Sequence, residues 1–194
     1  MLLFFGGSFD PVHIGHLILA RDVMEHFGYQ KVIFIPTYLS PFKENHGASS
    51  QDRVEMLKLA IHRISQFDIE TYEVEKKGKS YTIETVFYLL EKYNLQKVDW
   101  LMGDDTFLSL HRWHRAKELL SYLNPVVVLR RFSPKEVETY RKKILGLENL
   151  KLYNARRLDI SSTEIRNRVK KGLDISFLVP WEVEEYIKKK GLYR

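Results

Sequence analysis

The sequence of 194 residues contains no cysteine. The chain therefore cannot form a disulfide framework, offers no thiolate nucleophile and cannot hold a thiolate-ligated zinc ion or iron–sulfur cluster. It also lacks the run of roughly 18 apolar residues that a membrane span needs. The opening segment, MLLFFGGSFDP, has neither the basic region nor the long apolar stretch of a secretory signal. These absences predict a cytoplasmic protein that does not associate with a membrane.

Glycine and proline are scarce, with ten and six residues, and no stretch is dominated by a few residue types. This composition excludes collagen-like and wholly disordered proteins. Hydrophobic residues make up 44% of the chain, which at this length is enough for one core of ordinary size and rather little for two. We therefore expect one domain over residues 1–194, in which residues from about 160 onward form a C-terminal helical part.

Positive charge is concentrated in the second half of the chain. The formal net charge is +6, and residues 130–171 contain thirteen lysines and arginines against five acidic residues. This concentration favours a site for polyanions, such as nucleotide phosphates or a nucleic acid. For individual charges, as at residues 141–143 and 170–171, the solvated polar face of a helix is the simpler explanation.

Short apolar runs alternate with amphipathic segments along the chain. The runs predict buried strands at residues 2–5, 32–36, 98–102 and 126–129. Helical spacing predicts helices at residues 15–27, 51–64, 82–93, 115–122 and 134–145. Buried strands joined by helices indicate a doubly wound, Rossmann-like α/β fold, a parallel sheet with helices on both faces. Ligands are expected at the carboxyl ends of its strands.

Helix boundary signals mark the C-terminal part. Ser161 stands three residues before Glu164, as in a capping box, and Gly172 follows a basic last turn. Proline and glycine bracket a further helix at residues 181–190. Residues 39–50 carry the weakest pattern, and their composition predicts a mobile loop near the strand ends.

The strongest chemical signal directly follows the first predicted strand. Two glycines, Gly6 and Gly7, lead through Ser8 and Phe9 to His13 and His16 at a helix start. Glycines let the backbone approach a ligand closely, and the free amides of a helix start favour phosphate. The spacing fits neither a Walker loop nor the dinucleotide fingerprint. There are two alternative interpretations. The glycines could form a plain turn, or the two histidines could be half of a metal site, although no third soft ligand lies nearby.

This segment reads Gly-x-Phe-Asp-Pro-x-His-x-Gly-His and resembles the signature of the nucleotidyltransferase superfamily. Further motifs follow in order and are similar to those of bacterial nicotinate-nucleotide adenylyltransferases: Ser80-Tyr81-Thr82, Met102-Gly103-Asp104-Asp105, Trp113, and Ile160 to Arg166. The resemblance covers nearly the whole chain. It implies adenylyl transfer from ATP to nicotinate mononucleotide, with Mg²⁺ as cofactor. It also implies no nucleic-acid partner and is compatible with a homo-oligomer.

The resemblance also assigns site residues. It implies that His13, His16 and Arg166 are catalytic and that no protein-bound metal is present. The implied ATP site, to which the C-terminal helical part contributes, contains Gly6, Gly7, Ser8, Phe9, His13, Gly15, His16, Ile160, Ser162, Thr163 and Arg166. The implied substrate site contains Lys43, Tyr81, Thr82, Gly103, Asp105 and Trp113.

Each motif has a structural alternative. Residues 161–166 combine hydroxyls, helix-start amides and an arginine that suit a phosphate tail, or they form a capping box beside a surface arginine. Thr82 could face a pyridine substituent or be a plain N-cap. Trp113 could stack on a pyridine ring or belong to the core. Asp105 could accept hydrogen bonds from the nucleotide or cap the next segment.

Three places depart from the family pattern. Ser40-Pro41-Phe42-Lys43 replaces Pro-Pro-His-Lys, so only the lysine role carries over. Arg130-Arg131-Phe132 replaces an Arg-Pro-Gly turn, and Asp104 adds a carboxylate without an assigned role. Rival interpretations are a nicotinamide-mononucleotide adenylyltransferase, a phosphopantetheine adenylyltransferase and a nonenzymatic nucleic-acid binder.

Overall fold

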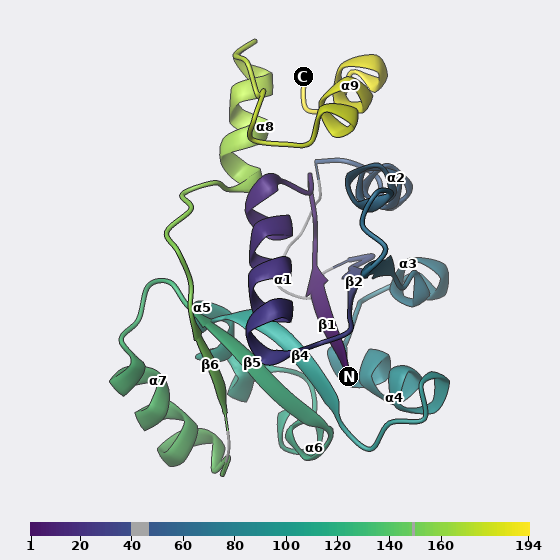
Figure 1. Ribbon diagram of the computed structural model, residues 1–194. Coiled ribbons are helices and arrows are strands. Elements are labelled where there is room, and N and C mark those ends of the chain that lie inside the picture. The colour runs from purple at the N-terminus through teal and green to yellow at the C-terminus, as the bar shows by residue number, and fades with distance from the viewer. Residues whose placement is uncertain (40–46, 149) are drawn as a thin grey trace.

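The computed structural model describes residues 1–39, 47–148 and 150–194 (Figure 1). Six parallel strands form one sheet in the order β3-β2-β1-β4-β5-β6. The strands are β1 (Leu2–Gly7), β2 (Lys31–Pro36), β3 (Phe67–Ile69), β4 (Val98–Gly103), β5 (Leu123–Leu129) and β6 (Lys151–Asn154). The strand order reverses between β1 and β4, which is where such sheets bind ligands. The predicted doubly wound parallel sheet is confirmed.

Helices connect the strands and continue beyond β6. They are α1 (Ile14–Phe27), α2 (Ser50–Ile61), α3 (Tyr72–Lys76), α4 (Thr82–Lys92), α5 (Asp104–Phe107), α6 (Ala116–Tyr122), α7 (Pro134–Tyr140), α8 (Ser162–Lys170) and α9 (Trp181–Lys190). A 3₁₀ turn, η1 (Leu110–Arg112), and a π-helical turn, η2 (Arg141–Leu145), complete the described elements. The helix predicted for residues 134–145 is therefore α-helical only to Tyr140. Within the described ranges, no helix combines the length and apolar composition of a membrane crossing.

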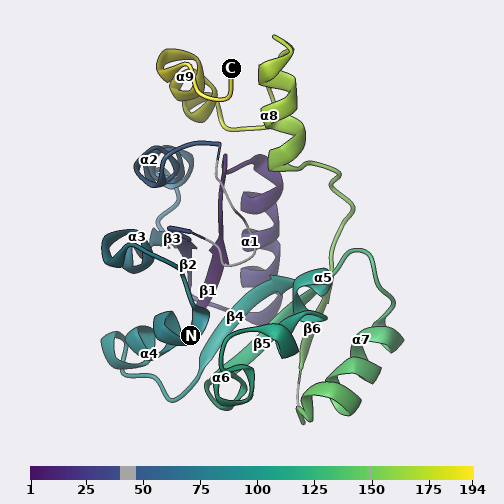
Figure 2. The ribbon, with the colours of Figure 1, turned by 180° about the vertical axis from the view of Figure 1, so that it is seen from behind.

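Alternate residues of the strands point into two separate hydrophobic cores, one on each face of the sheet. Leu3 and Phe5 of β1 point into the core formed with α1, α2 and α9, whereas Phe4 points into the core formed with α4, α6 and α7. Helices therefore cover both faces of the sheet, as the two views show (Figures 1 and 2). The first core also takes in Ile165 of α8, which fixes that helix above the carboxyl end of β1.

The predicted boundary signals of the last helices are present. The Ser161 hydroxyl accepts the Glu164 amide at 3.1 Å and caps α8. Gly191 ends α9 in the left-handed conformation, at φ 63°. Local chemistry therefore marks where α8 begins and where α9 ends, and packing against the first core holds both helices in place.

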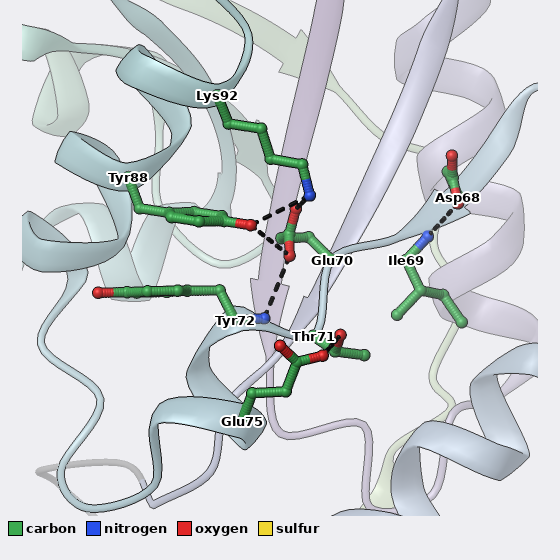
Figure 3. Close-up of polar contacts among 8 residues, drawn as sticks. All are labelled: Asp68, Ile69, Glu70, Thr71, Tyr72, Glu75, Tyr88 and Lys92. Atoms are coloured by element: carbon green, nitrogen blue, oxygen red, sulfur yellow. Dashed lines mark hydrogen bonds and ion pairs between the residues drawn. The ribbon is translucent and has the colours of Figure 1, made fainter.

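A buried carboxylate ties α3 and α4 to the edge of the sheet (Figure 3). Glu70 directly follows β3 and accepts hydrogen bonds from Lys92 Nζ at 2.6 Å and from the Tyr72 amide at 3.2 Å. The rings of Tyr72 and Tyr88 stack beside it, with centroids 4.1 Å apart. A buried charge needs such partners, and satisfying Glu70 fixes α4 relative to the sheet. The helix start at Thr82 is thereby positioned beside the carboxyl end of β4.

We expect Gly6→Ala to lower the free energy of unfolding by about 1–3 kcal/mol, the usual cost of overpacking a core. A methyl group at Gly6 would overlap the buried ring of Trp100 on β4. Urea unfolding measures the loss. Trp100→Phe in the Gly6→Ala background should restore part of it, because the six-membered part of the indole creates the overlap. Additive effects of the two substitutions would contradict the close packing of β1 against β4.

Candidate functional site

A cavity of about 290 Å³, the first cavity, lies at the carboxyl end of the sheet beside the start of α8. Its lining residues are Ser8, Asp10, His13, His16, Asp104, Asp105, Arg130, Arg131, Ile160, Ser161, Ser162, Thr163 and Arg166. Three arginines and two histidines thus converge from segments that are far apart in the sequence. Such a concentration of donors suits a polyanion such as a di- or triphosphate.

The two histidines form one stacked unit at the start of α1. Their ring centroids lie 3.6 Å apart with an interplanar angle of 25°. The backbone amide of His13 donates to Nδ1 of His16 at 3.3 Å, and the Phe9 ring packs edge-on against His16 at 5.1 Å. A methyl group at Gly15 would lie 3.1 Å from His13 Nδ1, so the glycine leaves room for that ring. The stacking orients both imidazoles toward the same cavity.

His13 is held in its neutral form. Burial, followed by the positive charge of Arg130, lowers its pKa from 6.5 to about 4. Its Nδ1 is buried and has no hydrogen-bond partner among the described residues. A buried polar atom without a partner is costly, and the neutral form of the ring keeps this cost smaller than a buried charge would.

Helix α8 packs onto the turn that follows β1. The Ser162 hydroxyl donates to the Pro11 carbonyl at 2.9 Å, and Arg166 Nη1 donates to the Asp10 carbonyl at 2.8 Å. Arg166 Nη2 also donates to Thr163 Oγ1 at 3.2 Å. These contacts unite the two motifs, 151 and 156 residues apart in sequence, in one wall of the first cavity. The motif at residues 161–166 is therefore both a capped helix start and part of this cavity.

Asp104, whose role the sequence left open, anchors the segment that follows β5. Its carboxylate accepts the amides of Arg130, Arg131 and Phe132 at 2.8, 2.8 and 2.9 Å. Burial alone would raise its pKa, but four backbone amides, including that of Asp105, lower the pKa overall. The ionised carboxylate therefore fixes the backbone of Arg130 and Arg131 at the rim of the first cavity.

A larger second cavity, of about 820 Å³, adjoins the first cavity. Its lining residues are Phe5, Gly6, Gly7, Ser8, Thr37, Glu73, Ser80, Tyr81, Thr82, Trp100, Leu101, Met102, Gly103, Asp105, Thr106, Ser109, Arg112, Trp113 and His114. Ser8 and Asp105 line both cavities. These two residues follow β1 and β4, so the cavities meet where the strand order reverses.

The second cavity combines aromatic rings with a helix start. Tyr81 is the N-cap of α4, and no side chain caps this helix within the described part of the chain. Its ring packs against His114 with centroids 4.5 Å apart. Trp113 is half-buried and its Nε1 donates to Ser109 Oγ at 3.4 Å. Rings and first-turn amides at one wall could hold a planar ring that carries an anionic substituent.

The predicted site residues are divided between the two cavities, and a few of them line neither cavity. Of the predicted ATP residues, Ser8, His13, His16, Ile160, Ser162, Thr163 and Arg166 line the first cavity. Gly6 and Gly7 line the second cavity, Phe9 is buried in the core, and Gly15 lies behind His13. Of the predicted substrate residues, Tyr81, Thr82, Gly103, Asp105 and Trp113 line the second cavity. Lys43, with residues 40–46 of the predicted mobile loop, lies outside the described residues.

Sequence reasoning missed two buried charged side chains near the cavities. Arg53 of α2 is fully buried and donates to the Ser8 and Tyr38 carbonyls at 2.6 and 3.1 Å. Glu73 of α3 accepts from the Thr85 hydroxyl at 2.6 Å, and burial raises its pKa. The sequence gave no signal for either residue, because charged side chains are usually exposed and nothing local marks these two as pointing inward.

No group of three His, Asp or Glu side chains that could hold a metal ion occurs in residues 1–39, 47–148 and 150–194. The carboxylates near the first cavity are occupied in other ways. Asp10 accepts the amides of Gly47 and Ala48, and Asp104 accepts those of residues 130–132. Asp105, at the junction of the two cavities, keeps half of its side chain exposed.

The low pKa of His13 predicts a loss of stability in acid. Between pH 6.5 and about pH 4 the unfolded chain takes up a proton at this residue and the folded chain does not. The free energy of unfolding therefore falls as the pH falls, by a total on the order of 3 kcal/mol. Urea unfolding of the parent and of His13→Gln at about pH 7.5 and about pH 5 measures this contribution. The parent should lose more stability than the variant, and equal losses would contradict the buried neutral histidine.

The chain resembles known proteins over its whole length. The cytidylyltransferase-like family model matches residues 4–168. A protein of Aquifex aeolicus, named probable nicotinate-nucleotide adenylyltransferase, is 49% identical over 168 residues, which cover 84% of this chain and all of that protein. A Hydrogenobaculum protein of the same name is 41% identical, over 99% of this chain and 97% of its own.

Solved structures agree at the level of the fold. The Plasmodium falciparum nicotinic acid mononucleotide adenylyltransferase, in its complex with NaAD, superimposes with a TM-score of 0.80. The superposition covers 99% of this chain and 96% of that protein, at 18% identity. The similarity of the sequences, the ordered motifs and the shared fold lead to one conclusion: the chain belongs to the nicotinate-nucleotide adenylyltransferases, within the cytidylyltransferase-like family.

Proposed function

We propose that this chain transfers the adenylyl group of ATP to the 5′-phosphate of nicotinate mononucleotide in NAD biosynthesis. The products are nicotinate adenine dinucleotide and pyrophosphate. The observation that carries this proposal is the junction of a basic cavity and an aromatic cavity at Ser8 and Asp105, in a member of this family. Two nucleotides bound in adjoining cavities would bring their phosphates together at that junction.

The first cavity supports binding of the ATP triphosphate. His13 and His16 would donate hydrogen bonds to oxygens of the α-phosphate, where charge develops during the reaction. Arg166, Ser162 and Thr163 would hold the leaving phosphates at the start of α8, which the C-terminal helical part thus contributes to the site. Arg130 and Arg131 add positive charge at the rim.

The transfer is an in-line displacement at phosphorus. A phosphate oxygen of the mononucleotide forms a bond with the α-phosphorus, and the bond between that phosphorus and the bridging oxygen to the β-phosphate breaks. Pyrophosphate leaves with the electron pair, so no covalent nucleophile of the protein is needed. The residues of the first cavity would align two polyanions and balance their charge, which is the main contribution of enzymes to phosphoryl-type transfer.

The surroundings of the cavities fit a divalent cation held mainly by phosphate oxygens and water. Asp10 and Asp104 are engaged by backbone amides, and among the residues that the structure describes Asp105 presents an exposed carboxylate at the junction. We propose Mg²⁺ for this role, where it would neutralise phosphate charge. A cytoplasmic location and a homo-oligomer stay predictions.

His16→Ala should reduce kcat/KM by about 100- to 1,000-fold while the chain stays folded, because it removes a donor aimed at developing charge. Pyrophosphate release measures turnover and circular dichroism measures folding. His62→Ala is the matched control, since His62 is an exposed histidine at the end of α2. A folded His16→Ala protein with parental turnover would remove this histidine from the phosphate site.

The second cavity favours nicotinate over nicotinamide mononucleotide. The carboxylate of nicotinate can accept hydrogen bonds from the open amides at the start of α4. The carboxamide of nicotinamide would instead point its own N–H groups at these amide donors and leave them unpaired. A mismatch of about 2–3 kcal/mol gives a preference in kcat/KM of tens- to over a hundredfold. Pyrophosphate release with each mononucleotide, measured side by side, tests the proposed function itself. Turnover with neither acceptor, together with salt-sensitive nucleic-acid binding, would favour the nonenzymatic alternative.

Trp113→Ala should raise the KM for the mononucleotide and leave the KM for ATP nearly unchanged, because Trp113 lines only the second cavity. Trp181→Ala is the matched control, since that indole is exposed at the start of α9. An unaffected mononucleotide KM in Trp113→Ala would show that this ring does not stack on the substrate.

A further inference from the structure

Three segments that are distant in sequence meet behind Arg166. They are the turn after β1 at Asp10, the residues before α2 at Gly47, and the residues after α9 at Tyr193. Asp10 and Tyr193 are 183 residues apart. None of the motifs in the sequence predicts a role for Gly47 or Tyr193.

The Asp10 carboxylate joins these segments. The Tyr193 hydroxyl donates to Asp10 Oδ1 at 2.7 Å, and the amides of Gly47 and Ala48 donate to the same carboxylate at 2.6 and 3.0 Å. Burial and the Asp10 charge raise the pKa of Tyr193, so its hydroxyl stays protonated and remains a donor. The carboxylate is buried, which makes each of these donors important.

Arg166 lies directly against this arrangement. Its Nη1 donates to the Asp10 carbonyl at 2.8 Å. A methyl group at Gly47 would lie 2.8 Å from Arg166 Cδ and 2.8 Å from Tyr193 Cε1. Gly47 therefore packs against both the ring of Tyr193 and the stem of Arg166, and only glycine leaves room for these two side chains. The arginine stem is restrained by packing while its guanidinium reaches the first cavity.

We propose that Gly47 and Tyr193 are positioning residues that hold Arg166 in the first cavity, with Asp10 as their common anchor, and thereby set the affinity for ATP. The proposal rests on the proposed function in one respect, the contact of Arg166 with the ATP phosphates. It predicts that substitutions at residues 47 and 193 act through Arg166 and not through general stability. Misplacement of a binding group by about 1 Å is enough to impair a phosphate site strongly.

The experiment compares the KM for ATP with the KM for nicotinate mononucleotide in single and double variants. Gly47→Ala should raise the KM for ATP by about tenfold and Tyr193→Phe by about threefold, each with less than about twofold change for the mononucleotide. In an Arg166→Ala background neither substitution should raise the KM for ATP further, because the group that they position is gone.

Tyr186→Phe is the matched control. Its hydroxyl donates to Asp52 at 2.8 Å and so also joins the C-terminal helices to α2, but Tyr186 does not line the first cavity. Its KM for ATP should equal the parental value. Equal effects of Tyr193→Phe and Tyr186→Phe, or an undiminished effect of Tyr193→Phe in the Arg166→Ala background, would overturn the proposal.

Calorimetric titration with a nonhydrolysable ATP analogue separates this inference from the proposed function. A parent that binds the analogue but releases no pyrophosphate would refute the proposed acceptor, while the same threefold weakening in Tyr193→Phe would still support the positioning role. A parent that does not bind the analogue would overturn both. If Gly47→Ala does not fold, Tyr193→Phe alone tests the positioning role. This variant removes a single oxygen atom and keeps the ring, so we expect it to fold.

Discussion

The buried carboxylate of Asp10 is the constraint on which the candidate site depends. A charge removed from water must be matched by hydrogen-bond donors, and these donors come from residues 47, 48 and 193. The hydrogen bonds to this one carboxylate therefore hold the residues before α2 and the residues after α9 against the turn that follows β1. The main-chain carbonyl of Asp10 accepts a hydrogen bond from Nη1 of Arg166. This charge therefore gives the three segments a common hydrogen-bond acceptor.

Asp104 repeats this arrangement on the other side of the first cavity. Its carboxylate accepts hydrogen bonds from the amides of residues 130–132 and so fixes the backbone of the two arginines that line the cavity, where Arg131 also lies 3.8 Å from the Asp105 carboxylate. Two acidic residues thus build a site for anions because their own charge is neutralised locally by backbone dipoles. Part of the positive charge between residues 130 and 171 consequently lies at a cavity, while the remainder occupies exposed helix faces.

The sequence predicted the parts whose information is local. The turn from Gly6 to His16 and the segment from Ser161 to Arg166 were visible because strand, glycines, histidines and cap follow one another directly. The contacts of Asp104, Arg53 and Tyr193 were not predictable, since their partners are 15 to 183 residues away. The strand Phe67–Ile69 and the helix Tyr72–Lys76 escaped prediction because three and five residues are too few to display a period.

Under the proposed function, the two cavities that share Ser8 and Asp105 would separate the chemistry of transfer from the choice of acceptor. Ser8 and Asp105 sit where the strand order reverses, and there the first cavity offers donors that, under the proposed function, would bind the ATP phosphates whichever acceptor is used. Under the proposed function, the second cavity, formed by the start of α4 and the aromatic residues after β4, would bind only the acceptor nucleotide. Substitutions in that wall can change which acceptor is chosen while the donors around His13 and Arg166 stay in place. Binding energy from the distant ring would then help to align the reacting phosphate at the junction, a form of catalysis that needs no covalent nucleophile.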